Sequence, residues 1–156
     1  MKSVTAIAFV AAIVLSAIAF PSNIGAAPAR DAGITFKDVE EKEWVLLEVK
    51  SAASAVSIDT DMGEVYTISF GENRLSGMGA PNRYNGPYTA GANRSLSIGS
   101  IASTMMAAFR EPDGLTESEY FNYLSNVTRW DLNEGKLELY SSNSDGTEAV
   151  LVFAGK

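Results

Sequence analysis

The feature that most constrains the fold is a two-residue alternation of apolar and polar side chains, which recurs from residue 43 to the end of the chain. In the segment VYTISF, Tyr66, Ile68 and Phe70 alternate with Thr67 and Ser69. The same spacing relates Val45, Leu47 and Val49; Leu96 and Ile98; Trp130 and Leu132; Leu137 and Leu139; Leu151 and Phe153. Because successive side chains of a β-strand point to opposite faces, each run predicts a strand with one buried face.

Turn signals separate these runs. Asn133-Glu134-Gly135 divides two strands and places glycine where a left-handed conformation is needed. Ser144-Asp145-Gly146 and Asp61-Met62-Gly63 mark two further hairpins. Short strands joined by turns at this spacing predict an antiparallel barrel or a sandwich.

One segment has helical spacing instead. Thr116 and Glu119 form the S/T-x-x-E pattern of a capping box, in which each side chain bonds the other residue's backbone N–H. Tyr120, Phe121, Leu124 and Val127 then recur on one helical face. The sequence therefore predicts one helix, over 117–126, that packs against the sheet or fills a barrel end.

The first 29 residues have the form of a secretory signal peptide and linker. Lys2 gives the start a positive charge, an apolar run extends from Val4 to Phe20, and small residues follow Pro21. We expect cleavage between residues 26 and 30, and a periplasmic or secreted protein. The alternative is an uncleaved membrane anchor, although the apolar run is shorter than the ~20 residues that a spanning helix needs.

Composition excludes several kinds of chemistry. The 156-residue chain contains no histidine and no cysteine, so it lacks the usual base of serine hydrolases, a thiol nucleophile, a disulfide and a zinc–thiolate site. It carries 19 acidic and 12 basic residues, a formal charge of −7, with no basic cluster. Nucleic acid is therefore not an expected partner. No pattern of catalytic residues, metal ligands or cofactor-binding residues stands out.

The region 75–108 is rich in glycine. It lacks the lysine of a phosphate-binding loop, and its glycines do not have the G-x-G-x-x-G spacing. We expect them at tight bends, at bulges and where strands of a curved sheet cross closely.

Several motifs in order resemble the META domain (HslJ-like) family. They are WVLLEV from Trp44, an F-x-x-x-R-x-S-G strand from Phe70 to Gly77, NRYNG from Asn82 leading to Tyr88, IGSIASTMMAA, the helix with Glu119, and KLELY with VLVF. The resemblance covers nearly all of the expected mature chain, with a domain over 36–154. It implies a mainly β (α+β) fold with one short helix, a small antiparallel barrel-like domain of about eight strands.

The resemblance also implies a role. Such domains are often exported, and they are associated with heat shock and other stress responses, with envelope integrity or with virulence. The family supplies no catalytic residues to carry over. Asn82, Arg83 and Tyr84 are the candidate binding residues. The alternative is that this run is a structural turn whose polar side chains satisfy buried backbone groups.

The chain departs from the family at two positions. Many relatives have a cysteine just before the Asn-Arg-Tyr run and another after the Thr-Met segment, where this chain has Pro81 and Ala108. Because both cysteines are missing together, we expect the two segments to be neighbours that packing holds together instead of a disulfide.

The leading hypothesis is an exported, non-enzymatic, monomeric domain that contacts an envelope or secreted protein and has no membrane span after signal cleavage. A small-ligand-binding barrel is the alternative, which a sizeable apolar cavity would favour and a filled core would disfavour. A carboxylate-based hydrolase is a weaker alternative, which would need two carboxyl groups converging in a cleft with raised pKa values.

Overall fold

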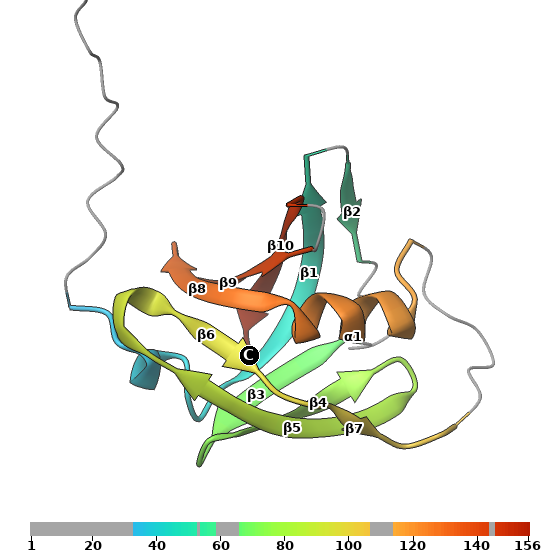
Figure 1. The fold of residues 1–156 in the computed structure, drawn as a ribbon, viewed down its shortest axis with the longest axis horizontal. Helices are drawn as coiled ribbons and strands as arrows, with labels where there is room; N and C mark the ends of the chain where they lie inside the picture. The colour runs from blue at the N-terminus through green and yellow to red at the C-terminus, as the bar shows by residue number, and fades with distance from the viewer. Residues whose placement is uncertain (1–32, 53, 59–65, 107–113, 144–145) are drawn as a thin grey trace, which may run out of the picture. The chain divides into compact units, whose positions relative to one another are not determined.

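The computed structural model describes residues 33–52, 54–58, 66–106, 114–143 and 146–156. The predicted signal peptide and the turn at Asp61-Met62-Gly63 lie outside these residues. Ten strands form one antiparallel sheet (Figure 1). They are β1 (Glu43–Ser51), β2 (Ala55–Ser57), β3 (Thr67–Gly71), β4 (Arg74–Gly79), β5 (Asn82–Ala90), β6 (Leu96–Ile98), β7 (Ala102–Ser103), β8 (Val127–Asn133), β9 (Lys136–Ser142) and β10 (Glu148–Gly155).

The sheet curves into a nearly closed barrel. Its main path contains eight strands in the order β6-β5-β4-β3-β1-β10-β9-β8, with β2 pairing with β1 and β7 pairing with β5. The two ends of the path meet at one isolated bridge between Ser95 and Arg129. The predicted class, a mainly β barrel-like domain with about eight strands and one short α-helix, is therefore confirmed.

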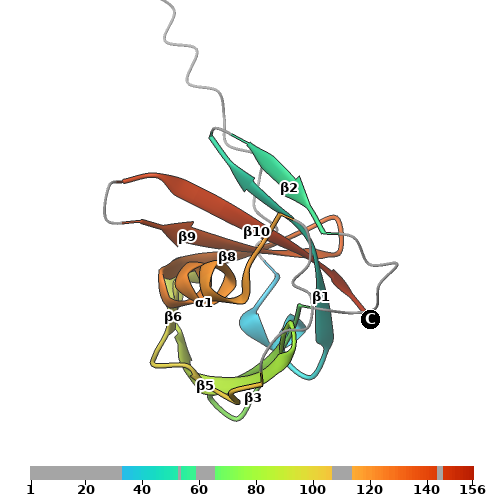
Figure 2. The same cartoon turned by 90° about the vertical axis from the view of Figure 1, so that its right-hand side faces the viewer.

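The helix α1 (Glu117–Ser125) occupies one end of the barrel, where the strands surround it (Figure 2). Its predicted capping box is present: Thr116 Oγ1 accepts a hydrogen bond from the Glu119 N–H, and the Glu119 carboxylate accepts one from the Thr116 N–H. Tyr120 and Leu124 are fully buried, as their spacing predicts. Val127 is buried too, but it begins β8 instead of extending the helix.

A short 3-10 helix, η1 (Phe36–Asp38), lies at the other end of the barrel. Phe36 packs its ring against Phe70, Tyr88 and Trp130, with ring centroids 5.1–5.3 Å apart within this group. Between the two ends, large side chains fill the interior. The largest fully buried ones include Trp44, Tyr66, Phe70, Phe153, Leu75, Leu137 and Leu139. The filled core counts against the small-ligand-binding barrel.

One predicted strand face is wrong. Val45, Leu47 and Val49 do not share the buried face of β1, because a β-bulge shifts the register against β10 between Leu46 and Glu48. Trp44, Leu46 and Val49 are the buried residues instead. A bulge adds one residue to a strand, so the side-chain alternation changes phase at that point.

The single strand predicted from Phe70 to Gly77 is also wrong, because the chain reverses within it. Glu72 and Asn73, with φ of 51° and 59°, form the turn between β3 and β4. The turn predicted at Asn133-Glu134-Gly135 is confirmed, with Glu134 and Gly135 as its two central residues.

Two glycines allow close approach, as expected for a curved sheet. A Cβ on Gly77 would lie 1.9 Å from the Thr67 carbonyl oxygen of the neighbouring strand. A Cβ on Gly79 would lie 2.9 Å from the ring of Phe121 on α1. These two residues share the inward face of β4 and let the strand lie close to β3 and to α1.

Candidate functional site

The three candidate binding residues do not form one surface. They begin β5, so Asn82 and Tyr84 point into the barrel and are buried, whereas Arg83 points outward and is exposed. The alternation of a strand therefore separates Arg83 from its two neighbours.

Asn82 fastens two segments to the start of β5. Its Oδ1 accepts hydrogen bonds from the Met106 N–H (2.7 Å) and the Thr104 hydroxyl (2.8 Å). Its Nδ2 donates to the Met106 carbonyl (3.2 Å) and to Glu117 Oε2 (2.9 Å) at the start of α1. The segment around Thr104 is thus a neighbour of the start of β5, as expected. Ala108 lies outside the described residues, so its proposed proximity to Pro81 stays a prediction.

Tyr84 takes part in a buried hydroxyl cluster below the helix. Its hydroxyl donates to the Thr67 carbonyl (2.7 Å) and lies 2.9 Å from the Tyr120 hydroxyl. Tyr66 donates to the Leu115 carbonyl (2.6 Å) and packs against Tyr120. Burial raises the pKa of both Tyr84 and Tyr120, because a phenolate would lose its hydration there. These groups anchor α1 and stay protonated at neutral pH.

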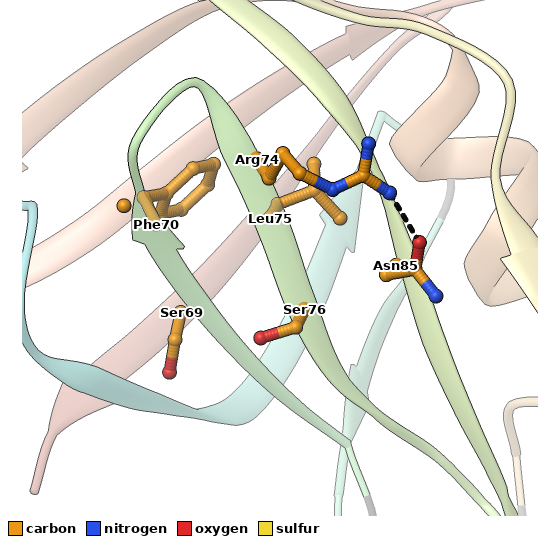
Figure 3. A pocket seen from close by; sticks show the side chains of 7 residues that line it. Ser69, Phe70, Arg74, Leu75, Ser76 and Asn85 are labelled. Carbon is orange, nitrogen blue, oxygen red and sulfur yellow. Dashed lines mark hydrogen bonds between the residues drawn. The ribbon is translucent and has the colours of Figure 1, made fainter.

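The outward faces of β3, β4 and β5 form a different surface, which we call the outer groove. Its residues are Ser69, Arg74, Ser76, Met78, Arg83 and Asn85. Strand pairing places Ser69 beside Ser76, and Ser76 beside Asn85 (Figure 3). Two shallow hollows of about 380 and 310 Å³ lie here, and they share these three residues.

An arginine lies in each hollow of the outer groove. Arg74 donates from Nη2 to Asn85 Oδ1 at 2.5 Å, a contact with a neutral amide that leaves its charge uncompensated (Figure 3). Within the described part of the chain, the side chain of Arg83 has no hydrogen bond or ion pair. At the edge of the outer groove nearest β1, Glu43 forms an ion pair with Lys156 (3.2 Å between Oε2 and Nζ). The outer groove therefore offers two exposed cationic groups beside small hydroxyl groups.

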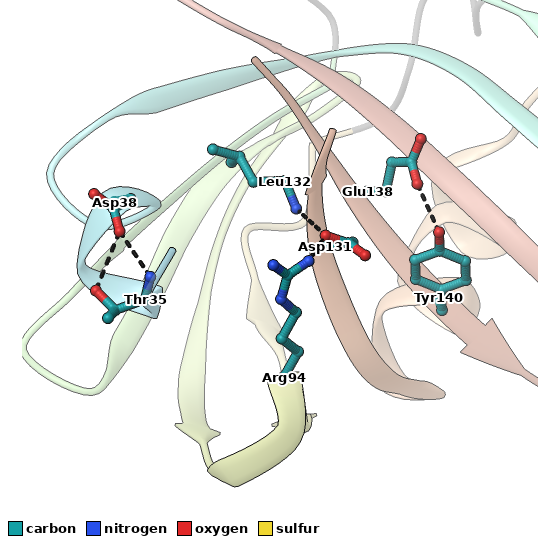
Figure 4. A network of polar contacts seen from close by, with 7 residues as sticks. All are labelled: Thr35, Asp38, Arg94, Asp131, Leu132, Glu138 and Tyr140. Atoms are coloured by element: carbon teal, nitrogen blue, oxygen red, sulfur yellow. Dashed lines mark hydrogen bonds and ion pairs between the residues drawn. The ribbon is translucent and has the colours of Figure 1, made fainter. Parts of the chain in front are cut away.

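The carboxyl groups of Glu119 and Asp38 serve structural roles, and hydrogen bonds lower the pKa of both. Hydrogen bonds from the Thr116 backbone and side chain lower the pKa of Glu119, and those from Thr35 lower the pKa of Asp38 (Figure 4). A general acid would need a shift in the opposite direction. Across the described ranges, no group of three or more acidic side chains is placed to hold a metal ion.

A polar contact holds the seam where the barrel closes. Arg94, in the 3-10 helix η2 (Ala92–Arg94), forms an ion pair with Asp131 of β8 (Figure 4). Its guanidinium also lies over the ring of Trp130, 5.5 Å from the centroid. Both side chains of the ion pair are largely buried. This pair adds to the single backbone bridge between the ends of the sheet.

Two methionines form a second exposed feature. Met105 is 99% exposed and Met106 is 55% exposed, although Asn82 fixes the backbone of Met106. They are the exposed large apolar side chains among the residues that the structure describes. Exposed apolar side chains of this kind are found at protein contacts when they gather into a patch.

Comparison with known families decides the classification. The model of the META domain matches residues 37–154 of this chain. The chain belongs to the META domain family. Comparison with curated proteins finds no match.

Solved structures share the META fold seen here. An NMR structure of a protein from Burkholderia xenovorans is 25% identical, with a TM-score of 0.65, and the match covers 88% of this chain and 97% of that one. A second NMR structure is 22% identical, with a TM-score of 0.54 and coverage of 78% and 94%. A DUF4847 family protein from Bacteroides vulgatus is 13% identical, with a TM-score of 0.50 and coverage of 76% and 95%, and shows likeness of fold alone.

Sequence reasoning missed most of the outer groove of this META domain. Ser69, Ser76 and Asn85 come from three strands, and only the pairing register brings them together. One signal was present: in the F-x-x-x-R-x-S-G motif, Arg74 and Ser76 are two residues apart and so share a strand face. The motif did not reveal that the turn at 72–73 places this face beside Ser69.

Proposed function

We propose that this META-domain protein is exported, has no enzymatic activity, and acts in a stress response or at the cell envelope through contacts with another protein. The form of residues 1–29 supports export. The absence of histidine and cysteine from the sequence supports a non-enzymatic role. The family resemblance supports the link to stress and the envelope.

One observation carries the choice of protein contacts: the polar outer groove remains exposed while aromatic and aliphatic side chains fill the barrel interior. Ligands that enter a barrel mouth need interior space, whereas a partner that binds an outer face does not. Met105 and Met106 offer further exposed area on the β7 side.

Within the part of the chain that the structure describes, no helix is both long and apolar enough to cross a membrane. Export is tested by expressing the full chain and a variant without residues 1–29, then separating the cellular fractions. We expect the full-length gene product in the periplasm or medium. N-terminal sequencing should show that it has been cleaved between residues 26 and 30. Retention of the uncut full chain in the membrane fraction would contradict this.

Partner binding is tested by affinity capture from envelope extract, with wild type, Arg83→Ala and Lys136→Ala. Lys136 is exposed at the start of β9, away from the outer groove, and serves as the matched control. We expect Arg83→Ala to lose the captured protein and Lys136→Ala to keep it. Equal capture by all three proteins would exclude the outer groove as the binding surface.

A further inference from the structure

We propose that the outer groove binds an extended acidic segment of the partner protein, with two carboxylates four residues apart pairing with Arg74 and Arg83. This inference rests on the proposed function, because it specifies the partner that protein contacts would involve. Charge, hydrogen-bonding capacity and strand register each support it.

Charge is the first support. The whole chain has a formal charge of −7, yet Arg74 and Arg83 are exposed on one face without an acidic partner among the described residues. Arg74 is held only by the neutral amide of Asn85, so its remaining N–H groups are available. A guanidinium with free N–H groups matches the two oxygens of a carboxylate.

The floor between the arginines is the second support. Ser69 and Ser76 are neighbours there, and their hydroxyls make no hydrogen bond within the described residues. Gly71, which pairs with Arg74 on this outer face, adds no side chain to the surface and leaves the hollow beside Arg74 open. An extended segment presents one N–H and one C=O per residue, and these hydroxyls can both donate to and accept from such groups.

Strand register gives the spacing. Arg74 pairs with Pro87 and Met78 with Arg83, so the two arginines are four residues apart along the strand direction, with both side chains outward. Four residues of a strand span about 14 Å. An extended segment projects residues i and i+4 to the same side, and residues i and i+3 to opposite sides.

One acidic residue, Glu43, lines the hollow that contains Arg83, at its β1 side. Its carboxylate is paired with the ammonium of Lys156, which reduces its repulsion of an acidic ligand. The segment is therefore expected to follow β4 and β5 and not to cross toward β1.

The test measures binding of the full-length exported protein to fluorescein-labelled, capped peptides. The peptides consist of serine and threonine with two glutamates, placed either four or three residues apart. Fluorescence anisotropy at low salt should show that the peptide with the four-residue spacing binds about fivefold more tightly than the peptide with the three-residue spacing. The second peptide can reach only one of the two arginines, and one exposed ion pair contributes up to that factor in affinity. Raising the salt should weaken the binding. A peptide with lysines in place of the glutamates should not bind.

Variants locate the binding. Arg74→Ala and Arg83→Ala should each weaken binding of the four-residue peptide about fivefold, and Lys136→Ala should leave it unchanged. Circular dichroism of each variant controls for folding. Equal binding by wild type and both arginine variants, or equal binding of both spacings, would overturn the proposal. Tighter Arg83-dependent binding of polygalacturonate, which lacks peptide groups, would also overturn the assignment to a protein segment.

The peptide test and the capture test can fail independently of each other. If the acidic peptides fail while Arg83-dependent capture from envelope extract persists, the acidic-segment proposal is wrong and the proposed function stands. If peptides bind with the predicted dependence while capture fails, the chemistry of the groove is supported and the choice of an envelope partner is overturned.

Discussion

Substituting Asn82 with aspartate tests whether this buried side chain is a structural clamp. The change keeps the shape and the two hydrogen bonds that Oδ1 accepts, but it removes both hydrogen bonds that Nδ2 donates. It also places a second carboxylate where Nδ2 now lies 2.9 Å from Glu117 Oε2. Two carboxylates at that distance cannot both stay ionised without a large cost.

The size of the expected loss in unfolding free energy follows from these contacts. Losing the bond to the Met106 carbonyl costs about 1 kcal/mol. The pair of carboxylates avoids repulsion by holding one proton, which at pH 7 costs about 4 kcal/mol for a group that ordinarily titrates near pH 4. We therefore expect Asn82→Asp to lower the free energy of unfolding by about 5 kcal/mol at pH 7.

The sign of the pH dependence is specific. The folded variant keeps a proton that the unfolded chain has released, so lowering the pH favours the folded variant. The deficit relative to wild type should shrink by about 1.4 kcal/mol per pH unit between pH 7 and 5. Urea unfolding followed by the fluorescence of the buried Trp44 and Trp130 measures this.

Two controls accompany the measurement. Asn82→Ala should be destabilised without this pH dependence, because it adds no carboxyl group. Asn85→Asp, on the exposed face of the same strand and beside Arg74, should change stability by no more than about 0.5 kcal/mol. A deficit for Asn82→Asp that does not change with pH, or no deficit at all, would refute the clamp as described.

Three further predictions concern stability. Gly77→Ala should lower the free energy of unfolding by about 2–3 kcal/mol, measured by thermal or urea unfolding, because the new Cβ would meet the Thr67 carbonyl. Gly71→Ala should stay within about 1 kcal/mol of wild type, because nothing lies near its Cβ. Thr116→Ala should cost about 1 kcal/mol through the lost helix cap, seen as a lower urea midpoint with an unchanged slope. Burial raises the pKa of Tyr120, so its contribution to stability should be intact below about pH 10 and lost as the pH rises further, and Tyr120→Phe should reduce that alkaline loss.

The sequence predicted most of the strands because one face of each is buried. Alternation identified the inward side chains of Tyr66, Ile68 and Phe70, and the barrel buries all three. It failed in β1, where the bulge after Leu46 changes the phase without any glycine or proline to signal it. It also failed at Glu72 and Asn73, where two non-glycine residues adopt positive φ.

The candidate site was harder to predict than the fold. The β5 strand divides the Asn-Arg-Tyr run between the two sides of the sheet, and Asn82 and Tyr84 are occupied with internal hydrogen bonds. The outer groove depends on which residues of β3, β4 and β5 are opposite one another. That register is set by turns and by long-range packing, so local composition could not reveal Ser69 and Ser76 as neighbours.

The pairing of β1 with β10 has a consequence for how the chain folds. Trp44 is opposite Gly155, so β1 meets its partner only after more than a hundred intervening residues have been brought together. The hairpins of β3, β4 and β5 need only short loop closures, whereas this ladder has a high entropic barrier. We expect refolding to be slow for a chain of this size, and a chain that ends before β10 to be protease-sensitive, because the barrel cannot form around its core.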